Sequence, residues 1–165
     1  MKGRKGVASR LVAITTACAL TSCAGHGMRF TEDDRVRIVT PHELSTAAAP
    51  VHIRWTTSPA LAPSQRFAVF VDRIPVHPGQ RLRSLGDDAC KRTPGCPDDQ
   101  YLAQRNVYLT PTPTLDLPTL PIGGQGASRE DRHVHKATII VVDSAGRRIG
   151  ESAWSVQFQE PADTR

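Results

Sequence analysis

Thirteen prolines, distributed from Pro41 to Pro161, limit the fold of this 165-residue chain more than any other feature. Proline has no amide hydrogen to donate, and its ring clashes with the preceding helical turn, so it interrupts helices. The prolines therefore exclude long helices from most of the chain. We expect one helical turn, at residues 97–104, where Asp98 and Asp99 would lie favourably near its first turn.

Between the prolines, apolar and polar residues alternate with the two-residue period of a β-strand. Val51, Ile53 and Trp55 fall on one face of such a run and Trp154 on the apolar face of another, so we expect both tryptophans in the core. Seven runs have this pattern or a β-branched composition: residues 35–40, 51–55, 66–72, 106–110, 114–117, 134–143 and 154–158. Short strands separated by turn residues predict an all-β fold, an antiparallel β-sandwich of about seven strands.

Two of these segments resemble parts of immunoglobulin and fibronectin-III modules. Residues 50–55 are similar to their first core strand, and residues 135–158, with a turn from Asp143 to Gly146, are similar to their last two strands. The resemblance implies an immunoglobulin-like β-sandwich at residues 35–160, followed by a short tail at 161–165. The cysteine–tryptophan–cysteine arrangement of true immunoglobulin domains is absent, since the two cysteines of the body are too close in sequence to join facing sheets.

The first 20 residues have the pattern of an export signal. Four basic residues precede an apolar stretch at 11–20. This stretch is too short to cross a bilayer, which needs about 20 apolar residues, but it suits the central part of a signal peptide.

The residues that follow, Leu20-Thr21-Ser22-Cys23, resemble the lipobox of bacterial lipoproteins. The resemblance implies that residues 1–22 are removed as a signal peptide and that the thiol of Cys23 carries a diacylglyceryl group. Two or more acyl chains would then hold the protein on a membrane. The alternative is an ordinary cleaved signal peptide in which Cys23 has no role. Residues 23–34 would form a tether between the lipid and the domain.

Net charge argues against nucleic-acid binding. The chain has 21 basic and 16 acidic residues, but four of the basic residues lie in the first 22, which leaves 17 against 16. A nearly neutral body lacks the excess of cations that nucleic-acid binding requires. Its 15 arginines against two lysines indicate a GC-rich genome, and the body resembles the surface lipoproteins of high-GC bacteria.

Two cysteines, Cys90 and Cys96, remain after removal of the signal peptide and lipidation of Cys23. They enclose a segment with a Pro94-Gly95 pair, which favours a turn. An even pair of nearby cysteines outside the cytoplasm predicts a disulfide. Because its loop is short, we expect it to fix a surface loop rather than the whole fold.

The loop at residues 72–97 is the candidate binding region. It contains prolines that limit its flexibility, the predicted disulfide, and four side chains suited to carboxylates or phosphates: Arg73, His77, Arg81 and Arg83. A scaffold that displays one constrained loop is typical of a binding module. The alternative is that these side chains are ordinary solvated residues.

A weaker candidate site is formed by His133 and His135, which share one face of a predicted strand. They would bind a metal only if a third ligand such as His77 or Asp131 lay near, and solvated histidines are the commoner case. The paired carboxylates at 87–88 and 98–99 lack the spacing of a calcium loop and are interpreted as solvated. No motif of a hydrolase or of a cofactor site is present, so we expect neither catalysis nor a cofactor.

The sequence as a whole predicts a non-enzymatic lipoprotein, anchored on the extracytoplasmic face of a cell membrane and acting as a surface interaction or structural module. Its partner beyond the membrane would be an envelope protein or a wall polymer. The alternative function is an extracytoplasmic solute- or metal-binding lipoprotein that uses His133 and His135.

Overall fold

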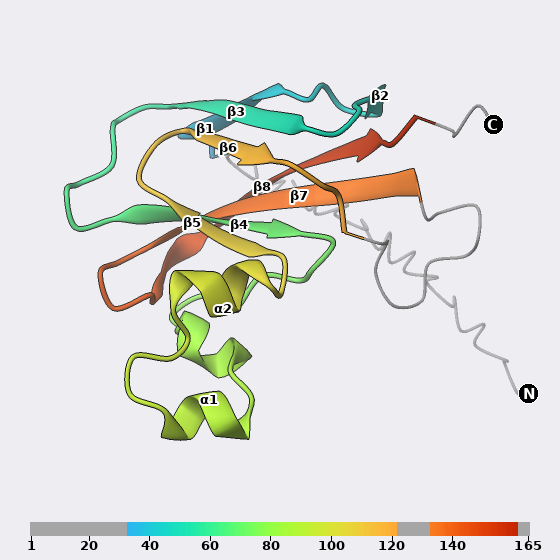
Figure 1. Ribbon diagram of the computed structural model, residues 1–165. Helices are drawn as coiled ribbons and strands as arrows, with labels where there is room; N and C mark the ends of the chain where they lie inside the picture. The colour runs from blue at the N-terminus through green and yellow to red at the C-terminus, as the bar shows by residue number, and fades with distance from the viewer. Residues whose placement is uncertain (1–32, 122–132, 162–165) are drawn as a thin grey trace, which may run out of the picture. The chain divides into compact units, whose positions relative to one another are not determined.

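The computed structural model describes residues 33–121 and 133–161, which form two β-sheets. The predicted signal peptide, Cys23 and nearly all of the tether lie outside the described residues. One sheet has three strands in the order β1 (Val36–Thr40), β3 (Val51–Thr57) and β6 (Thr114–Leu117). The other has five, in the order β2 (Ser45–Thr46), β8 (Arg148–Gln159), β7 (Val134–Val142), β4 (Arg66–Val71) and β5 (Val107–Thr110). Figure 1 shows the three-stranded sheet lying over the five-stranded one.

The prediction of an all-β fold in two sheets is confirmed, but the strand count differs. The described residues contain eight strands, and the additional strand, β2, pairs parallel with β8, so that the larger sheet is mixed. A strand of two residues is too short for alternation to reveal. β8 also begins six residues before the predicted run, because a bulge interrupts its alternation: Ile139 pairs with Trp154, whereas Val141 pairs with Ile149.

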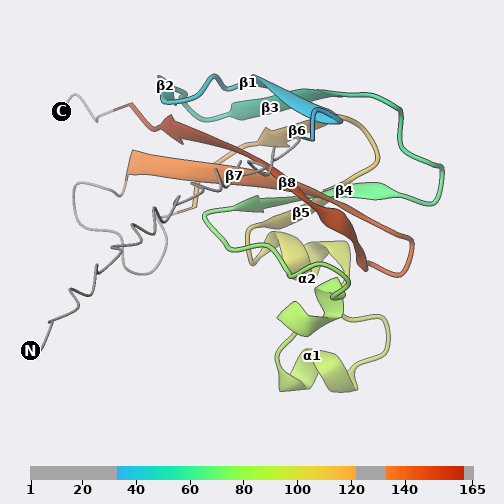
Figure 2. The same cartoon turned by 180° about the vertical axis from the view of Figure 1, so that it is seen from behind.

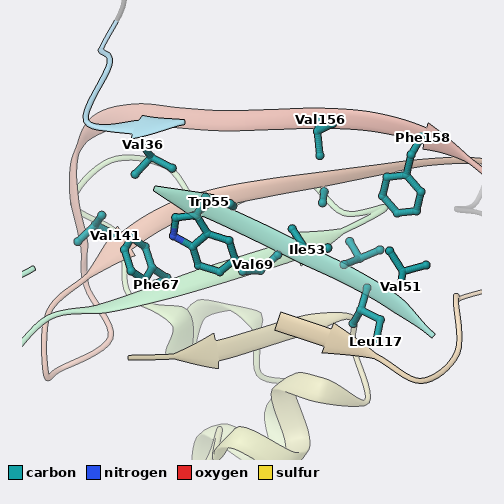
Figure 3. Packing of buried hydrophobic residues seen from close by; sticks show 13 residues of the cluster. Val36, Val51, Ile53, Trp55, Phe67, Val69, Leu117, Val141, Val156 and Phe158 are labelled. Atoms are coloured by element: carbon teal, nitrogen blue, oxygen red, sulfur yellow. The ribbon is translucent and has the colours of Figure 1, made fainter. Parts of the chain in front are cut away.

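The main core fills the space between the two sheets (Figure 3). Strand β3 shows the predicted alternation, with Val51, Ile53 and Trp55 buried and the residues between them exposed. The ring of Trp55 packs edge-on against Phe67, with 5.1 Å between ring centroids. Trp154 differs from the prediction, since it is only partly buried and packs against the margin of this core.

A second core lies on the outer face of the five-stranded sheet. Strand β4 is buried on both faces: Phe67 and Val69 point into the sandwich, whereas Ala68 and Phe70 contact the segment that joins β4 to β5. This segment contains η1 (Leu82–Leu85), α1 (Asp88–Arg92) and α2 (Asp99–Ala103). Figure 2 shows, from behind, that α2 lies against the sheet beside β5, whereas α1 lies farther from the sheet. The helical turn expected at 97–104 is confirmed by α2, but η1 and α1 were not predicted.

Candidate functional site

The segment that joins β4 to β5, residues 72–106, holds the candidate binding residues, and two aspartates begin its helices. An N-cap carboxylate stabilises a first turn by accepting a hydrogen bond from a backbone amide. Asp87 accepts from the amide of Cys90 at 2.8 Å, and Asp98 accepts from the amide of Tyr101 at 2.7 Å. The paired carboxylates are exposed, as expected, but one of each pair also has this capping role.

Asp87 also connects α1 to the end of α2. Its second carboxylate oxygen accepts from Arg105 at 3.0 Å, and its amide donates to the hydroxyl of Tyr101 at 2.9 Å. Two interactions lower the pKa of Asp87. The larger effect comes from the hydrogen bond of the Cys90 amide, and the next from the hydrogen bond with the Tyr101 side chain. The guanidinium of Arg105 in turn lies over the ring of Tyr101, 3.5 Å from its centroid.

The predicted Cys90–Cys96 disulfide is present and links α1 to the residue before Pro97. The two Cα atoms are 5.2 Å apart, within the usual range for a disulfide. Cys90 is buried, and a Cβ atom at Gly86 would lie 2.9 Å from its sulfur, so a side chain at that position would require a shift. The disulfide thus fixes the helical part of the segment locally, as its short loop predicts.

Two of the four candidate binding residues hold the segment together. Arg73 is partly buried and donates to the carbonyl of Arg105 at 3.3 Å. Arg83 donates to the carbonyl of Lys91 at 2.8 Å. Each guanidinium keeps other N–H groups that these bonds do not use, but both side chains have a structural role that the sequence did not reveal.

The other two candidates, His77 and Arg81, lie on one exposed turn. Their side chains are exposed and make no hydrogen bond within the part of the chain that the structure describes. The turn between β7 and β8 brings Arg147 beside them: Arg147 forms a β-bridge with Arg81 and donates to the carbonyl of Gly79 at 3.1 Å. We call His77, Arg81 and Arg147 the cationic turn surface. The sequence could not reveal Arg147 as a member, because strand pairing alone brings it there.

His135 is not solvated, in contrast to the commoner case expected for histidines at a strand entry. Its side chain is 1% exposed, and its Nδ1 atom lies 2.7 Å from a carboxylate oxygen of Asp72. The other oxygen of Asp72 accepts from the amide of Lys136 at 2.8 Å. Asp72 has a φ of 52°, a left-handed conformation that aspartate tolerates better than most residues, and this bend follows directly after β4.

His133 and His135 do not share their surroundings. His133 is exposed, and its Nδ1 atom lies 3.9 Å from a carboxylate oxygen of Glu160. The Nε2 atom of His135 is buried without a hydrogen-bond partner. Within residues 33–121 and 133–161, no group of three or more metal-ligating side chains is close enough to hold an ion. Asp131, one of the suggested third ligands, lies outside the described residues.

Residues at the start of the described chain form a cluster that sequence reasoning missed. The carboxylate of Asp33 accepts hydrogen bonds from Arg35 and from the hydroxyl of Ser152, and its carbonyl accepts from the indole of Trp154. Arg35 also lies 5.6 Å from the centroid of the Trp154 ring. The hydrogen bonds from Arg35 and Ser152 hold the pKa of Asp33 well below its usual range. The end of the predicted tether is therefore fixed to β8.

A buried arginine connects β8 to the candidate binding segment. Arg148 is 7% exposed and donates to the carbonyls of Val76 at 2.7 Å, Glu151 at 2.6 Å and Ser152 at 3.2 Å. Burial lowers its pKa, and the charge of Glu151 acts in the opposite direction. Three carbonyl acceptors compensate part of the cost of burying this cation. The same side chain thus holds the bulge of β8 and the loop that follows β4.

Comparisons of the chain with models of protein families, with curated proteins and with solved structures found no match. No helix in the described ranges is long and apolar enough to cross a membrane.

Proposed function

We propose that this protein is a lipid-anchored bacterial envelope lipoprotein, held by Cys23 on the extracytoplasmic face of the cell membrane. It acts without catalysis, as a surface interaction or structural module. Its partner is an envelope protein or an anionic wall polymer that contacts the cationic turn surface. The lipobox-like pattern at residues 20–23 supports the anchor.

The observation that carries the proposed interaction role is the construction of residues 72–106. This segment is fixed in three ways: by packing on the outer face of the five-stranded sheet, by the Cys90–Cys96 disulfide and by the buried Arg148. His77 and Arg81 nevertheless stay exposed, with Arg147 beside them. Exposed guanidinium and imidazole groups on a fixed loop lose little conformational entropy on binding, which favours recognition of carboxylates or phosphates.

We also propose that the fold is immunoglobulin-like. Strands β1, β3 and β6 form one sheet, and β5, β4, β7 and β8 follow one another in the other. This division of strands, in which the chain from β3 onward crosses between the sheets after β3, after β5 and after β6, supports a likeness to sandwiches of the immunoglobulin and fibronectin-III type. The short parallel pairing of β2 with β8 is an addition at one sheet edge.

The anchor is tested by intact-mass spectrometry and membrane fractionation of the protein made in its own cell. We expect a membrane-bound mass equal to residues 23–165 plus acyl chains. Cys23→Ala should abolish the added mass and either release the protein or leave it unprocessed. Acylation that persists in Cys23→Ala would refute the anchor.

The interaction role is tested by crosslinking the membrane-bound protein. We expect one recurrent crosslinked species, reduced when His77→Gln and Arg81→Gln are combined. The matched control is Arg92→Gln, which removes an exposed arginine from the last turn of α1. Equal crosslinking by all three proteins would exclude the cationic turn surface as the contact.

The metal-binding alternative needs His133 and His135 to ligate one ion. Asp72 already occupies the Nδ1 side of His135, which argues against it. A titration with Zn(II) or Cu(II), monitored through the imidazole NMR signals of the two histidines, decides whether they bind a metal. Selective perturbation of both at stoichiometric metal would favour this alternative.

A further inference from the structure

A second feature, separate from the cationic turn surface, is an open groove of about 450 Å³ beside the start of β3. The chain between β1 and β3 forms one wall, and the exposed side chains of His52 and Arg54 contribute the other. Both views show this part of the chain near β2, at the end of the sandwich where β8 finishes (Figures 1 and 2). A cavity of this size suits a small organic ligand.

The wall formed by residues 40–48 is held in place from both sides. On the β3 side, the hydroxyl of Thr40 donates to the carbonyl of His52 at 3.0 Å. On the β8 side, the amide of Leu44 donates to the carbonyl of Gln157 at 2.7 Å, and the carboxylate of Glu43 accepts from the amide of Gln157 at 3.0 Å. These bonds hold the groove without any contribution from a ligand.

The backbone of this wall also contains an unusual conformation. Leu44 has a φ of 58°, in the left-handed region that a bulky side chain rarely adopts, and its side chain is 61% exposed. Such a conformation persists only where the surrounding bonds impose it. No core packing explains it, since the side chain is largely in solvent.

The ionisable side chains that line the groove are all bases: His42, His52 and Arg54. Arg54 makes no ion pair or side-chain hydrogen bond within the described residues, so its guanidinium fork is free for an anion. Two carboxylates beside the lining histidines are already engaged: Glu43 accepts from the amide of Gln157, and Asp116 lies 2.7 Å from the Nδ1 atom of His52. Asp116 thereby fixes the orientation of the His52 ring at the groove.

The remaining lining combines three hydroxyl-bearing residues with small apolar ones: Thr40, Ser45 and Thr46, and Pro41, Ala47, Ala48, Pro50 and Val51. We propose that this groove binds an organic carboxylate with a short apolar substituent. The carboxylate would pair with Arg54 and an adjacent imidazole, and the substituent would lie against the alanines and prolines. Planar guanidinium and carboxylate groups match in geometry, which makes arginine the residue suited to such a ligand.

The test uses the full chain, labelled with ¹³C at its histidine side chains, and N-acetylalanine as the probe. Millimolar N-acetylalanine should shift the signals of His42 and His52 and leave unchanged that of His133, an exposed histidine outside both proposed anion-binding surfaces. The uncharged matched probe, N-acetylalaninamide, should shift none of them. Butyrate is the second carboxylate probe: tighter binding of N-acetylalanine indicates the C-terminus of a peptide, and tighter binding of butyrate indicates a free organic acid.

Variants show whether the groove is responsible. Arg54→Gln should weaken the affinity for N-acetylalanine about tenfold, as expected for the loss of a charge-assisted hydrogen bond. Arg92→Gln, on α1, should leave it unchanged. The proposal is wrong if no histidine signal shifts, if the amide probe acts as strongly, or if the two variants bind alike. Arg54 is exposed and makes no bond that the fold needs, so its variant tests binding rather than folding.

Discussion

At the scale of single residues, burial separates two histidine–aspartate pairs that are otherwise alike. In both pairs Nδ1 lies 2.7 Å from a carboxylate oxygen. The side chains of His52 and Asp116 are 55% and 66% exposed, whereas those of His135 and Asp72 are 1% and 8% exposed. Water replaces a lost partner only in the exposed pair, so the same bond has different consequences for stability.

Removal of the buried carboxylate should therefore be costly. Asp72→Ala leaves both the His135 ring and the amide of Lys136 without their acceptor, and we expect it to lower the free energy of unfolding by about 2–4 kcal/mol. Asp116→Ala, the matched control, should lower it by less than about 1 kcal/mol. Urea unfolding of the two variants measures both values. Similar losses would show that burial does not govern these pairs.

The two tryptophans also differ by position. Trp55 lies wholly within the core, and Trp55→Ala should lower the free energy of unfolding by about 3–5 kcal/mol. Trp154 is partly exposed and donates to the carbonyl of Asp33, so Trp154→Ala should lower it by only about 1–3 kcal/mol. Urea unfolding compares the variants. A larger loss for Trp154→Ala would contradict the placement of these rings.

At the scale of elements, the helical part of residues 72–106 depends on local restraints. Helices α1 and α2 have five residues each, too few to be stable in isolation. The helices are stabilised locally by their aspartate caps and the disulfide. Apolar contacts such as that of Leu102 hold the segment on the sheet. The strands β4, β7 and β8 are in addition held to one another by long ladders of backbone pairing.

Reduction of the disulfide should consequently loosen this element alone. We expect the reduced protein to lose at most about 2–4 kcal/mol and to remain folded. Hydrogen exchange should accelerate at the amides of Lys91 and Leu102, which donate within the helical part, and stay slow in β7 and β8. Two thiols that react in the native, unreduced protein would show that the bond is absent in solution.

At the scale of the whole molecule, contacts between edge residues help to join the two sheets. At one edge, Asp33 joins the beginning of the described chain to Ser152 and Trp154 of β8. This connection places β1 of one sheet against β8 of the other. It also means that force applied at Asp33 would be borne by β8 as well as by β1.

The same connection makes stability depend on pH. The pKa of Asp33 is lower in the folded protein than in the unfolded chain, so folding favours the ionised carboxylate. Its contribution to the free energy of unfolding is complete above about pH 5 and decreases as the pH falls further. Asp33→Asn should therefore destabilise the protein at pH 7 more than at about pH 3. Urea unfolding at both pH values tests this, and an equal loss at both would show that ionisation of Asp33 does not matter.

The sequence alone determined seven of the eight described strands, though not the first six residues of β8, because alternation such as that of Val51, Ile53 and Trp55 depends only on which residues must leave water. It also determined the disulfide and α2, whose signals are local. Only the tertiary structure decided what the exposed and buried polar residues do. The pairing of His135 with Asp72, of Asp33 with Ser152, and of Arg81 with Arg147 joins residues far apart in the chain. Such contacts follow from strand register and sheet packing, which local patterns do not encode.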